Sequence, residues 1–271
     1  MQFKPGLLSV LAAVVLILLM GVLGGQLTRE IDISSLDDSP SLGLPLLWLG
    51  ESVKGTAIGY WQLGDSTKVR VLVLGSIHGD EPEGVDFAWG LTQSVWKADP
   101  DSLPCFLGIS HCANPDGYLA KTRRNARGID LNRNFPTLDF VVGDSLSRYY
   151  GGREPLSEPE SQAIVKLIED FRPDLIVALH APLNCVNFDG PAEAEAARLA
   201  ELLNLPLVID LGYATRGSLG GYYGRERNQK VITLEFPSGK DSWQKFGPGF
   251  LRWLEEIGDL KEAGSEEMGA R

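Results

Sequence analysis

Four residues of types that do chemistry stand out in this chain of 271 residues: His78, Glu81, His180 and Glu235. His78 and Glu81 are three residues apart, so both side chains can turn toward one point. With His180 they supply two imidazoles and one carboxylate, the protein ligands of one common type of catalytic zinc site, in which water fills the remaining position. Glu235 is separate from that set and could take a proton from the water. The sequence therefore predicts one Zn²⁺ bound by three residues, with Glu235 as the general base.

Each of these residues also has a purely structural interpretation. His78 and Glu81 could close a strand and begin a helix. His180 could be a hydrogen-bonded core histidine, and Glu235 a buried ion-pair partner. His111, the remaining histidine of the chain, alternates with apolar neighbours. For this residue the structural interpretation is preferred. The catalytic interpretation of the other four depends on a fold that brings them together.

The apolar runs of the chain predict such a fold. Uninterrupted apolar residues are typical of strands buried on both faces of a parallel sheet. Strands of this kind are predicted at Val71–Gly75 and Leu175–Leu179, with others at Leu46–Leu49, Thr56–Leu63, Phe106–Cys112, Leu207–Ile209 and Val231–Leu234. Helices are predicted from Pro82, over Pro191–Leu203 and over 241–262, the last interrupted near Gly247–Gly249. The alternation predicts one α/β domain (46–263) with a mixed, largely parallel central sheet and helices on both faces, followed by a frayed tail (264–271).

Polar residues follow the carboxyl ends of four of these strands: His78, Asn114, His180 and Glu235. In open α/β sheets, ligands bind beyond the carboxyl ends of the strands. We therefore expect these side chains to converge at one edge of the sheet.

A long segment without periodicity, 118–156, is rich in Arg, Asn and Gly. A loop of that length inside a compact domain is usually functional. It leads into Ser157-Glu158-Pro159-Glu160, whose Ser and Glu have the spacing of a capping box and predict a helix start.

Composition limits the class of protein and its partners. The net charge of −11, from 25 Lys and Arg against 36 Asp and Glu, argues against a broad nucleic-acid surface. The apolar run 5–25 is typical of a signal peptide or a membrane anchor, and 26–45 of a linker. We expect export, and association with a membrane if the run is not cleaved. The three cysteines match no zinc-ligand spacing, and Cys112 could pair with Cys185 after export.

Several motifs resemble those of the zinc metallocarboxypeptidases, in an order that is specific to the family. They span roughly Gly50 to Phe236 and comprise His78-Gly-Asp-Glu81, Asn114-Pro-Asp-Gly117, Arg123–Phe135, Tyr150–Glu160, His180 and Ile232–Phe236. Within the family, His78–Pro82 and the segment from His180 to Pro191 look most like the bacterial murein peptide amidase A group. That group cleaves the γ-D-glutamyl–diaminopimelate bond of cell-wall peptides.

The resemblance implies roles for individual residues. His78, Glu81 and His180 would bind zinc, and Glu235 would be the general base. Arg123 would stabilise the oxyanion, to which a fixed cation in a dry site can contribute on the order of 3 kcal/mol. Asn132 and Arg133 would hold the free carboxylate of the substrate, which a guanidinium can grip with two hydrogen bonds.

Two further substrate contacts are predicted in the segment Thr215–Tyr223, which resembles the part of the family that carries a mobile tyrosine. Tyr222 and Tyr223 both suit that role, and Tyr222 is favoured. Arg216 stands where related sequences often have Pro. This extra cation could bind a second substrate carboxylate, such as the distal one of diaminopimelate.

Together these observations predict a zinc-dependent peptidase or amidase that acts next to a residue with a free carboxylate. Its partner would be a peptide of the cell wall, met in the periplasm or at the inner membrane facing it. The main alternative is a metallocarboxypeptidase of ordinary peptides, and a more distant one is an acyl-amino-acid hydrolase. A non-catalytic binding module on the same fold is a third. The side-chain specificity and the oligomeric state stay open.

Overall fold

A computed structural model of the chain describes residues 45–98, 102–239 and 241–269. Its strands are β1 (Leu47–Glu51), β2 (Ala57–Leu63), β3 (Val69–Leu74), β4 (Cys105–Ser110), β5 (Leu175–His180), β6 (Leu183–Asp189) and β7 (Lys230–Pro237). Its helices are α2 (Pro82–Lys97), α3 (Pro115–Ala120), α4 (Pro159–Phe171), α5 (Glu193–Leu203) and α6 (Ser242–Gly269). A 3-10 turn, η3 (Leu131–Arg133), and a π-helical turn, η4 (Gly220–Arg225), complete the described elements.

The strands form one sheet in the order β1-β2-β4-β3-β5-β7-β6. The four central strands, β4, β3, β5 and β7, are parallel to one another. The edge strands pair antiparallel, β2 with β4 and β1 with β2 on one side and β6 with β7 on the other. The predicted mixed α/β sheet is confirmed, with its parallel part at the centre.

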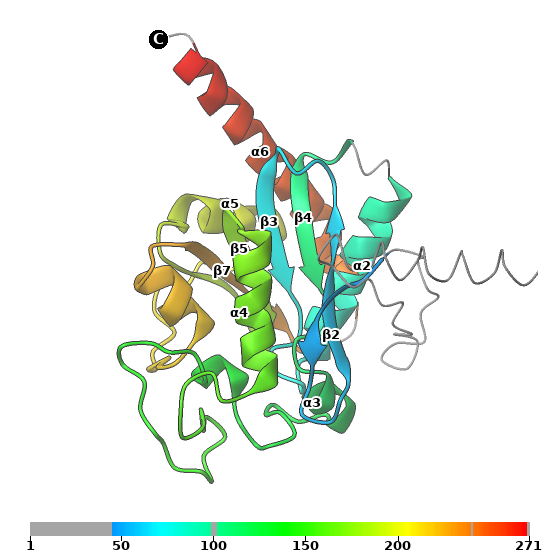
Figure 1. Cartoon of the computed structure of the whole chain (residues 1–271). Helices are drawn as coiled ribbons and strands as arrows, with labels where there is room; N and C mark the ends of the chain where they lie inside the picture. The colour runs from blue at the N-terminus through cyan, green and yellow to red at the C-terminus, as the bar shows by residue number, and fades with distance from the viewer. Residues whose placement is uncertain (1–44, 99–101, 240, 270–271) are drawn as a thin grey trace, which may run out of the picture.

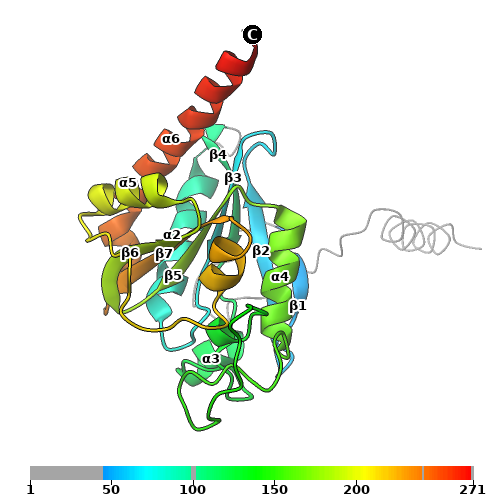
Figure 2. The same ribbon diagram turned by 90° about the vertical axis from the view of Figure 1, so that its left-hand side faces the viewer.

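Helices cover both faces of this sheet (Figures 1 and 2). Helices α2, α5 and α6 pack on one face and α4 on the other. The segment Val71–Leu74 of β3 has no polar residue, and its surroundings explain why. Val71 and Val73 pack with α2 and α6, while the alternating Leu72 and Leu74 pack with α4. A strand between two apolar layers needs apolar side chains on both sides.

The predicted signal or anchor segment (1–25), and the linker except its last residue, lie outside the described residues. Among the helices of the described part, none has both the length and the apolarity that a membrane span requires.

Three local predictions were wrong. The first is the strand at Leu207–Ile209: Leu207 forms only an isolated bridge with Val186 of β6, a strand that was not predicted. Helix α6 continues through Pro248, because its residues Phe250 and Trp253 are buried in the core, and such packing supplies most of a helix's stability in proteins.

The capping box before α4 is the third. Glu158, not Ser157, is the residue at the N-cap, and no side chain caps the helix. The Ser157 hydroxyl instead donates to the Glu158 carboxylate at 2.9 Å and accepts from Asn134 Nδ2 at 3.1 Å. Glu158 and Glu160 each accept a hydrogen bond from Asn125 Nδ2 in the long loop, at 2.8 and 3.0 Å. The two glutamates therefore anchor the 118–156 loop to α4 instead of capping the helix.

The chain crosses itself closely where the loop after β3 meets α3. The amide of Gly79 donates to the Arg123 carbonyl oxygen at 3.3 Å. A Cβ atom at Gly79 would lie 1.9 Å from the carbonyl carbon of Gly117 in α3. Only glycine permits this approach, which fixes the backbone between His78 and Glu81.

We expect Gly79→Ala to lower the free energy of unfolding by about 1–3 kcal/mol, because the new methyl group meets backbone that cannot move aside easily. It should also weaken zinc binding by displacing His78 and Glu81. Gly143→Ala is the matched control, since a Cβ there meets nothing within 4 Å. Denaturant unfolding and zinc titration measure both effects. Equal behaviour of the two variants would contradict this account of the crossing.

Candidate active site

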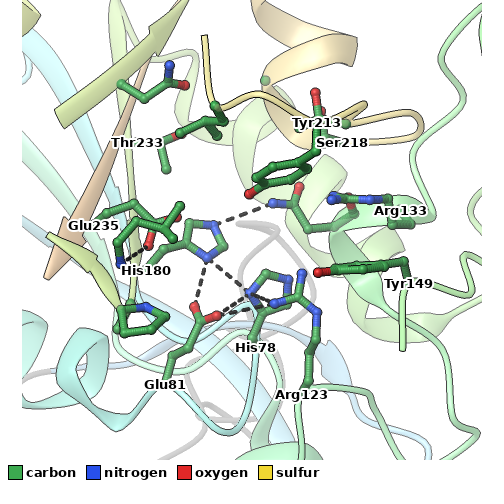
Figure 3. Close-up of a pocket in the computed structure, with 18 of the residues that line it drawn as sticks. His78, Glu81, Arg123, Arg133, Tyr149, His180, Tyr213, Ser218, Thr233 and Glu235 are labelled. Carbon is green, nitrogen blue, oxygen red and sulfur yellow. Dashed lines mark hydrogen bonds and ion pairs between the residues drawn. The ribbon is translucent and has the colours of Figure 1, made fainter. Parts of the chain in front are cut away.

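The structure brings His78, Glu81 and His180 together at the carboxyl edge of the sheet (Figure 3). His78 follows β3, Glu81 is the N-cap of α2, and His180 ends β5. The Nδ1 atoms of His78 and His180 each lie 2.8 Å from a different carboxylate oxygen of Glu81, and 3.1 Å from one another. All three residues are buried. Two imidazole nitrogens and a carboxylate facing one point are a donor set that fits zinc.

Strong electrostatic coupling marks this cluster. Burial alone would lower the pKa of His78, but the charges of Glu81 and Asp130 outweigh it and raise that pKa to about 9. Burial would raise the pKa of Glu81, yet the two histidines hold it well below its usual range. Since a metal ion binds the neutral imidazole, zinc binding must displace a proton from His78 at neutral pH.

Asp130 is a part of the site that the sequence analysis missed. It is fully buried, lies 3.2 Å from His78 Nε2 through Oδ1, and accepts a hydrogen bond from Arg123 Nε at 2.9 Å through Oδ2. With Nε2–H held by this carboxylate, Nδ1 of His78 is left to face the metal position. Such partners of a ligating histidine fix its tautomer and its orientation.

Glu235 lies in β7 directly opposite His180 in β5. It lines the same pocket as the three ligands without belonging to their cluster. Its Oε2 accepts a hydrogen bond from the Leu183 amide at 3.3 Å. Burial raises the pKa of Glu235, which makes its carboxylate a stronger proton acceptor.

The long loop supplies two arginines and an asparagine to the wall of the pocket across from Glu235 (Figure 3). Arg123, Asn132 and Arg133 all line the pocket. Arg123 Nη1 lies 3.4 Å from Glu81 Oε1, so its charge faces the reaction centre. Asn132 Oδ1 accepts from the Leu219 amide at 2.9 Å, and Arg133 donates to the Asn132 carbonyl oxygen at 2.5 Å. These bonds hold both side chains in place before any substrate binds.

Two tyrosines of the pocket were not predicted. The Tyr149 ring lies under the guanidinium carbons of Arg123 and Arg133, at 5.3 and 5.5 Å from its centroid. Tyr213 lies across the pocket from Glu81, next to Arg133 (Figure 3). A phenol is protonated at neutral pH, and burial raises the pKa of Tyr213 further, so its hydroxyl can donate a hydrogen bond. Little in the sequence indicated their position, because Tyr149 and Tyr213 both lie in segments without hydrophobic periodicity.

The structure does not bring Tyr222 or Arg216 to this pocket, which corrects both predictions. Tyr222 lies in η4, stacks on Phe135 at 6.2 Å, and has the Arg227 guanidinium over its ring. Arg216 is exposed outside the lining. Tyr213, two residues before the segment in which a substrate tyrosine was predicted, lines the pocket instead.

The remaining candidates lie elsewhere. His111 is buried between Trp61, whose ring stacks on it at 4.1 Å, and Thr92, whose hydroxyl is 2.7 Å from its Nε2. It has the structural role that was preferred for it. Cys112 and Cys185 do not form a disulfide with one another in the part of the chain that the structure describes, so the suggested pairing is not present.

The pocket has a volume of about 520 Å³, enough for a few residues of a peptide. The model of the zinc carboxypeptidase family matches residues 44–199, which include the three metal-binding candidates. The chain belongs to the zinc carboxypeptidase family. Family members depend on zinc, and the chain is a zinc metallopeptidase. Glu235 lies beyond the matched segment, and it is the sheet that places it beside the ligands.

Within the zinc carboxypeptidases, murein peptide amidases are similar to this chain over most of both lengths. Murein peptide amidase A of Escherichia coli K12 is 32% identical over 221 residues, 75% of this chain and 88% of the amidase. That of Vibrio campbellii is 33% identical over 226 residues, 78% of this chain and 88% of the amidase.

Solved structures agree with this placement. The murein-tripeptide amidase of E. coli O157 superposes with a TM-score of 0.65 at 30% identity, covering 78% of this chain and 91% of that one. Carboxypeptidase A of Helicoverpa armigera has the same fold, with a TM-score of 0.66 at 19% identity over 83% of this chain and 69% of that one.

We expect Asp130→Asn to weaken zinc binding about 10–100-fold, because His78 loses the charged acceptor that orients it. Asp116→Asn is the matched control, since Asp116 is also buried but accepts from Ser52 and Lys54, away from the zinc ligands. Competition with a zinc-binding dye measures the affinity of each variant. An Asp130→Asn protein that binds zinc as tightly as the control would contradict the positioning role.

Proposed function

We propose that this protein is a one-zinc amidase that hydrolyses the γ-D-glutamyl–diaminopimelate bond of murein peptides, with Glu235 as general base. The observation that carries the proposal is the pocket itself: a His/Glu/His cluster, a separate carboxylate and two arginines around one cavity. The likeness to murein peptide amidases across most of both chains favours their substrate over other peptides.

Recognition of the substrate would begin at its free carboxylate. Arg133 and Asn132 present donors from the loop wall, and the guanidinium can take both carboxylate oxygens. Tyr213 covers the same end of the pocket. This arrangement sets the scissile bond between the cationic wall and Glu235, so only a residue with a free carboxylate is placed for cleavage.

The chemistry follows from what lies on either side of that bond. Bound at His78, Glu81 and His180, zinc would polarise the scissile carbonyl and make water acidic enough to lose a proton at neutral pH. Glu235 takes a proton from the attacking water and gives it to the departing amine as the C–N bond breaks. Arg123 faces the carbonyl oxygen as negative charge develops on it. Because Arg123 is already held by Asp130, little reorganisation is needed.

We also propose that the enzyme is exported and works in the periplasm or at the inner membrane facing it. The uncharged apolar run 5–25 supports this location. Sequencing the N-terminus of the protein recovered from cell fractions tests it. An intact N-terminus in the soluble cytoplasmic fraction would contradict the proposal.

The proposed function is tested with two substrates. The purified enzyme should release diaminopimelate from L-Ala-γ-D-Glu-diaminopimelate, lose this activity to a zinc chelator, and regain it with about one equivalent of Zn²⁺. Ordinary peptides with free C-termini should be poor substrates. Chelator-sensitive cleavage of ordinary peptides alone would favour the carboxypeptidase alternative. Activity that persists through chelation would reject the zinc mechanism.

Glu235→Gln should lower kcat about 10²–10⁴-fold while zinc content stays unchanged, because the amide cannot accept the proton. In the parent enzyme, kcat/KM should fall on the acid side as Glu235 becomes protonated. Since burial raises the pKa of this carboxyl above its ordinary value of 4.5, the acid limb should lie above that pH. Steady-state kinetics and metal analysis provide both measurements. A fully active Glu235→Gln enzyme would remove Glu235 from the mechanism.

A further inference from the structure

An ion pair in the wall of the pocket has no part in the mechanism above. Asp189 ends β6 and Arg225 ends η4, and both line the cavity that holds the zinc ligands. Arg225 Nη1 donates to Asp189 Oδ1 at 3.0 Å, and its Nη2 donates to Thr215 Oγ1 at 3.0 Å. The guanidinium is therefore fixed from two sides beside the carboxylate.

The backbone of η4 is fitted closely around this pair. A Cβ atom at Gly220 would lie 2.0 Å from Asp189 Oδ2, and one at Gly224 would lie 2.4 Å from Asp189 Cβ. One at Gly221 would lie 2.8 Å from Arg225 Nη2. Side chains at these three positions would displace the charges, so the glycines of η4 leave the space in which the pair sits.

Both charges keep capacity for a ligand. The Arg225 side chain is 49% exposed and the Asp189 side chain 16%. Oδ2 of Asp189 accepts no hydrogen bond from any residue that the structure describes. An ammonium group can therefore reach the free carboxylate oxygen, while a carboxylate can reach the open side of the guanidinium.

A ligand with one charge alone suits this wall poorly. A lone carboxylate gains from Arg225 but is repelled by Asp189, and a lone ammonium meets the reverse situation. A group that carries both charges on one carbon, as an amino acid does, meets a complementary partner for each. Such selection by repulsion as well as attraction is how charged sites discriminate.

We propose that Asp189 and Arg225 form a subsite for a zwitterionic amino-acid group at the end of the side chain of the released residue. Diaminopimelate carries such a group. The inference rests on the proposed function and adds the pair of residues that would read the substrate's distal end. Arg225 thereby takes the role that the sequence suggested for Arg216.

Four peptides of the form L-Ala-γ-D-Glu-X test the subsite, with X as meso-diaminopimelate, lysine, 2-aminopimelate or norleucine. They present both distal charges, the ammonium alone, the carboxylate alone, or neither. The parent enzyme should have its highest kcat/KM for diaminopimelate. Arg225→Gln should lower the preference for diaminopimelate over lysine about 10–100-fold. Asp189→Asn should lower its preference over 2-aminopimelate by a similar factor, since hydrogen bonds between charged groups are of this strength.

Because each preference is a ratio within one variant, a general loss of folding or of zinc cancels. Arg227→Gln is the matched control, since Arg227 lies just after η4 and outside the pocket lining; its ratios should equal those of the parent. If Asp189→Asn does not fold, the preference of Arg225→Gln for diaminopimelate over lysine is sufficient to test the subsite.

The outcomes separate the two proposals. Similar kcat/KM for all four peptides in the parent enzyme would overturn the subsite and leave the murein amidase function standing. An Arg225→Gln enzyme that keeps the parent's preference for the diaminopimelate peptide over the lysine peptide would overturn the subsite in the same way. Failure of the parent enzyme to cleave any of the four would reject the proposed function, and the subsite with it.

Discussion

The buried cluster of His78, Glu81, His180 and Asp130 is the constraint on which the rest of this structure depends. Isolated charges are costly to bury, and these are tolerated because each lies within hydrogen-bond distance of an opposite partner. The same pairing gives His78 one nitrogen toward Asp130 and the other toward the metal position. The side chains of this cluster already lie close together around the metal position. Zinc can therefore replace the proton of His78 with little change in the positions of these side chains.

The sheet provides the rigidity that this cluster needs. Its parallel strands β3, β5 and β7 end side by side, and His78, His180 and Glu235 come from these three ends. Apolar layers on both faces keep the strands in register. Other segments complete the walls of the pocket: the long loop carries Arg123 and Arg133, and the Asp189–Arg225 pair joins the end of β6 to η4. The strand ends thus place His78, His180 and Glu235, while most of the other groups around the pocket come from segments outside the parallel strands.

This division explains what the sequence could predict. His78, His180 and Glu235 follow apolar runs whose burial fixes their direction, so their convergence could be inferred from the strand ends alone. Tyr222 and Arg216 lie in a loop segment with no periodic pattern, and their placement depends on how η4 packs against Phe135 and Asp189. Asp130 was missed because its role is to hold His78 and Arg123, and contacts distant in sequence leave no local pattern.

The central claim, that two imidazoles and a carboxylate bind a single zinc, is tested most directly by X-ray absorption at the zinc edge on the purified protein. The account predicts one zinc per chain. It also predicts a first shell of nitrogen and oxygen at about 2.0–2.1 Å, with the outer-shell scattering of two imidazoles. Loss of one imidazole in His180→Ala should be visible in the same spectrum. Sulfur ligands at about 2.3 Å, or a spectrum unchanged by His180→Ala, would contradict the account.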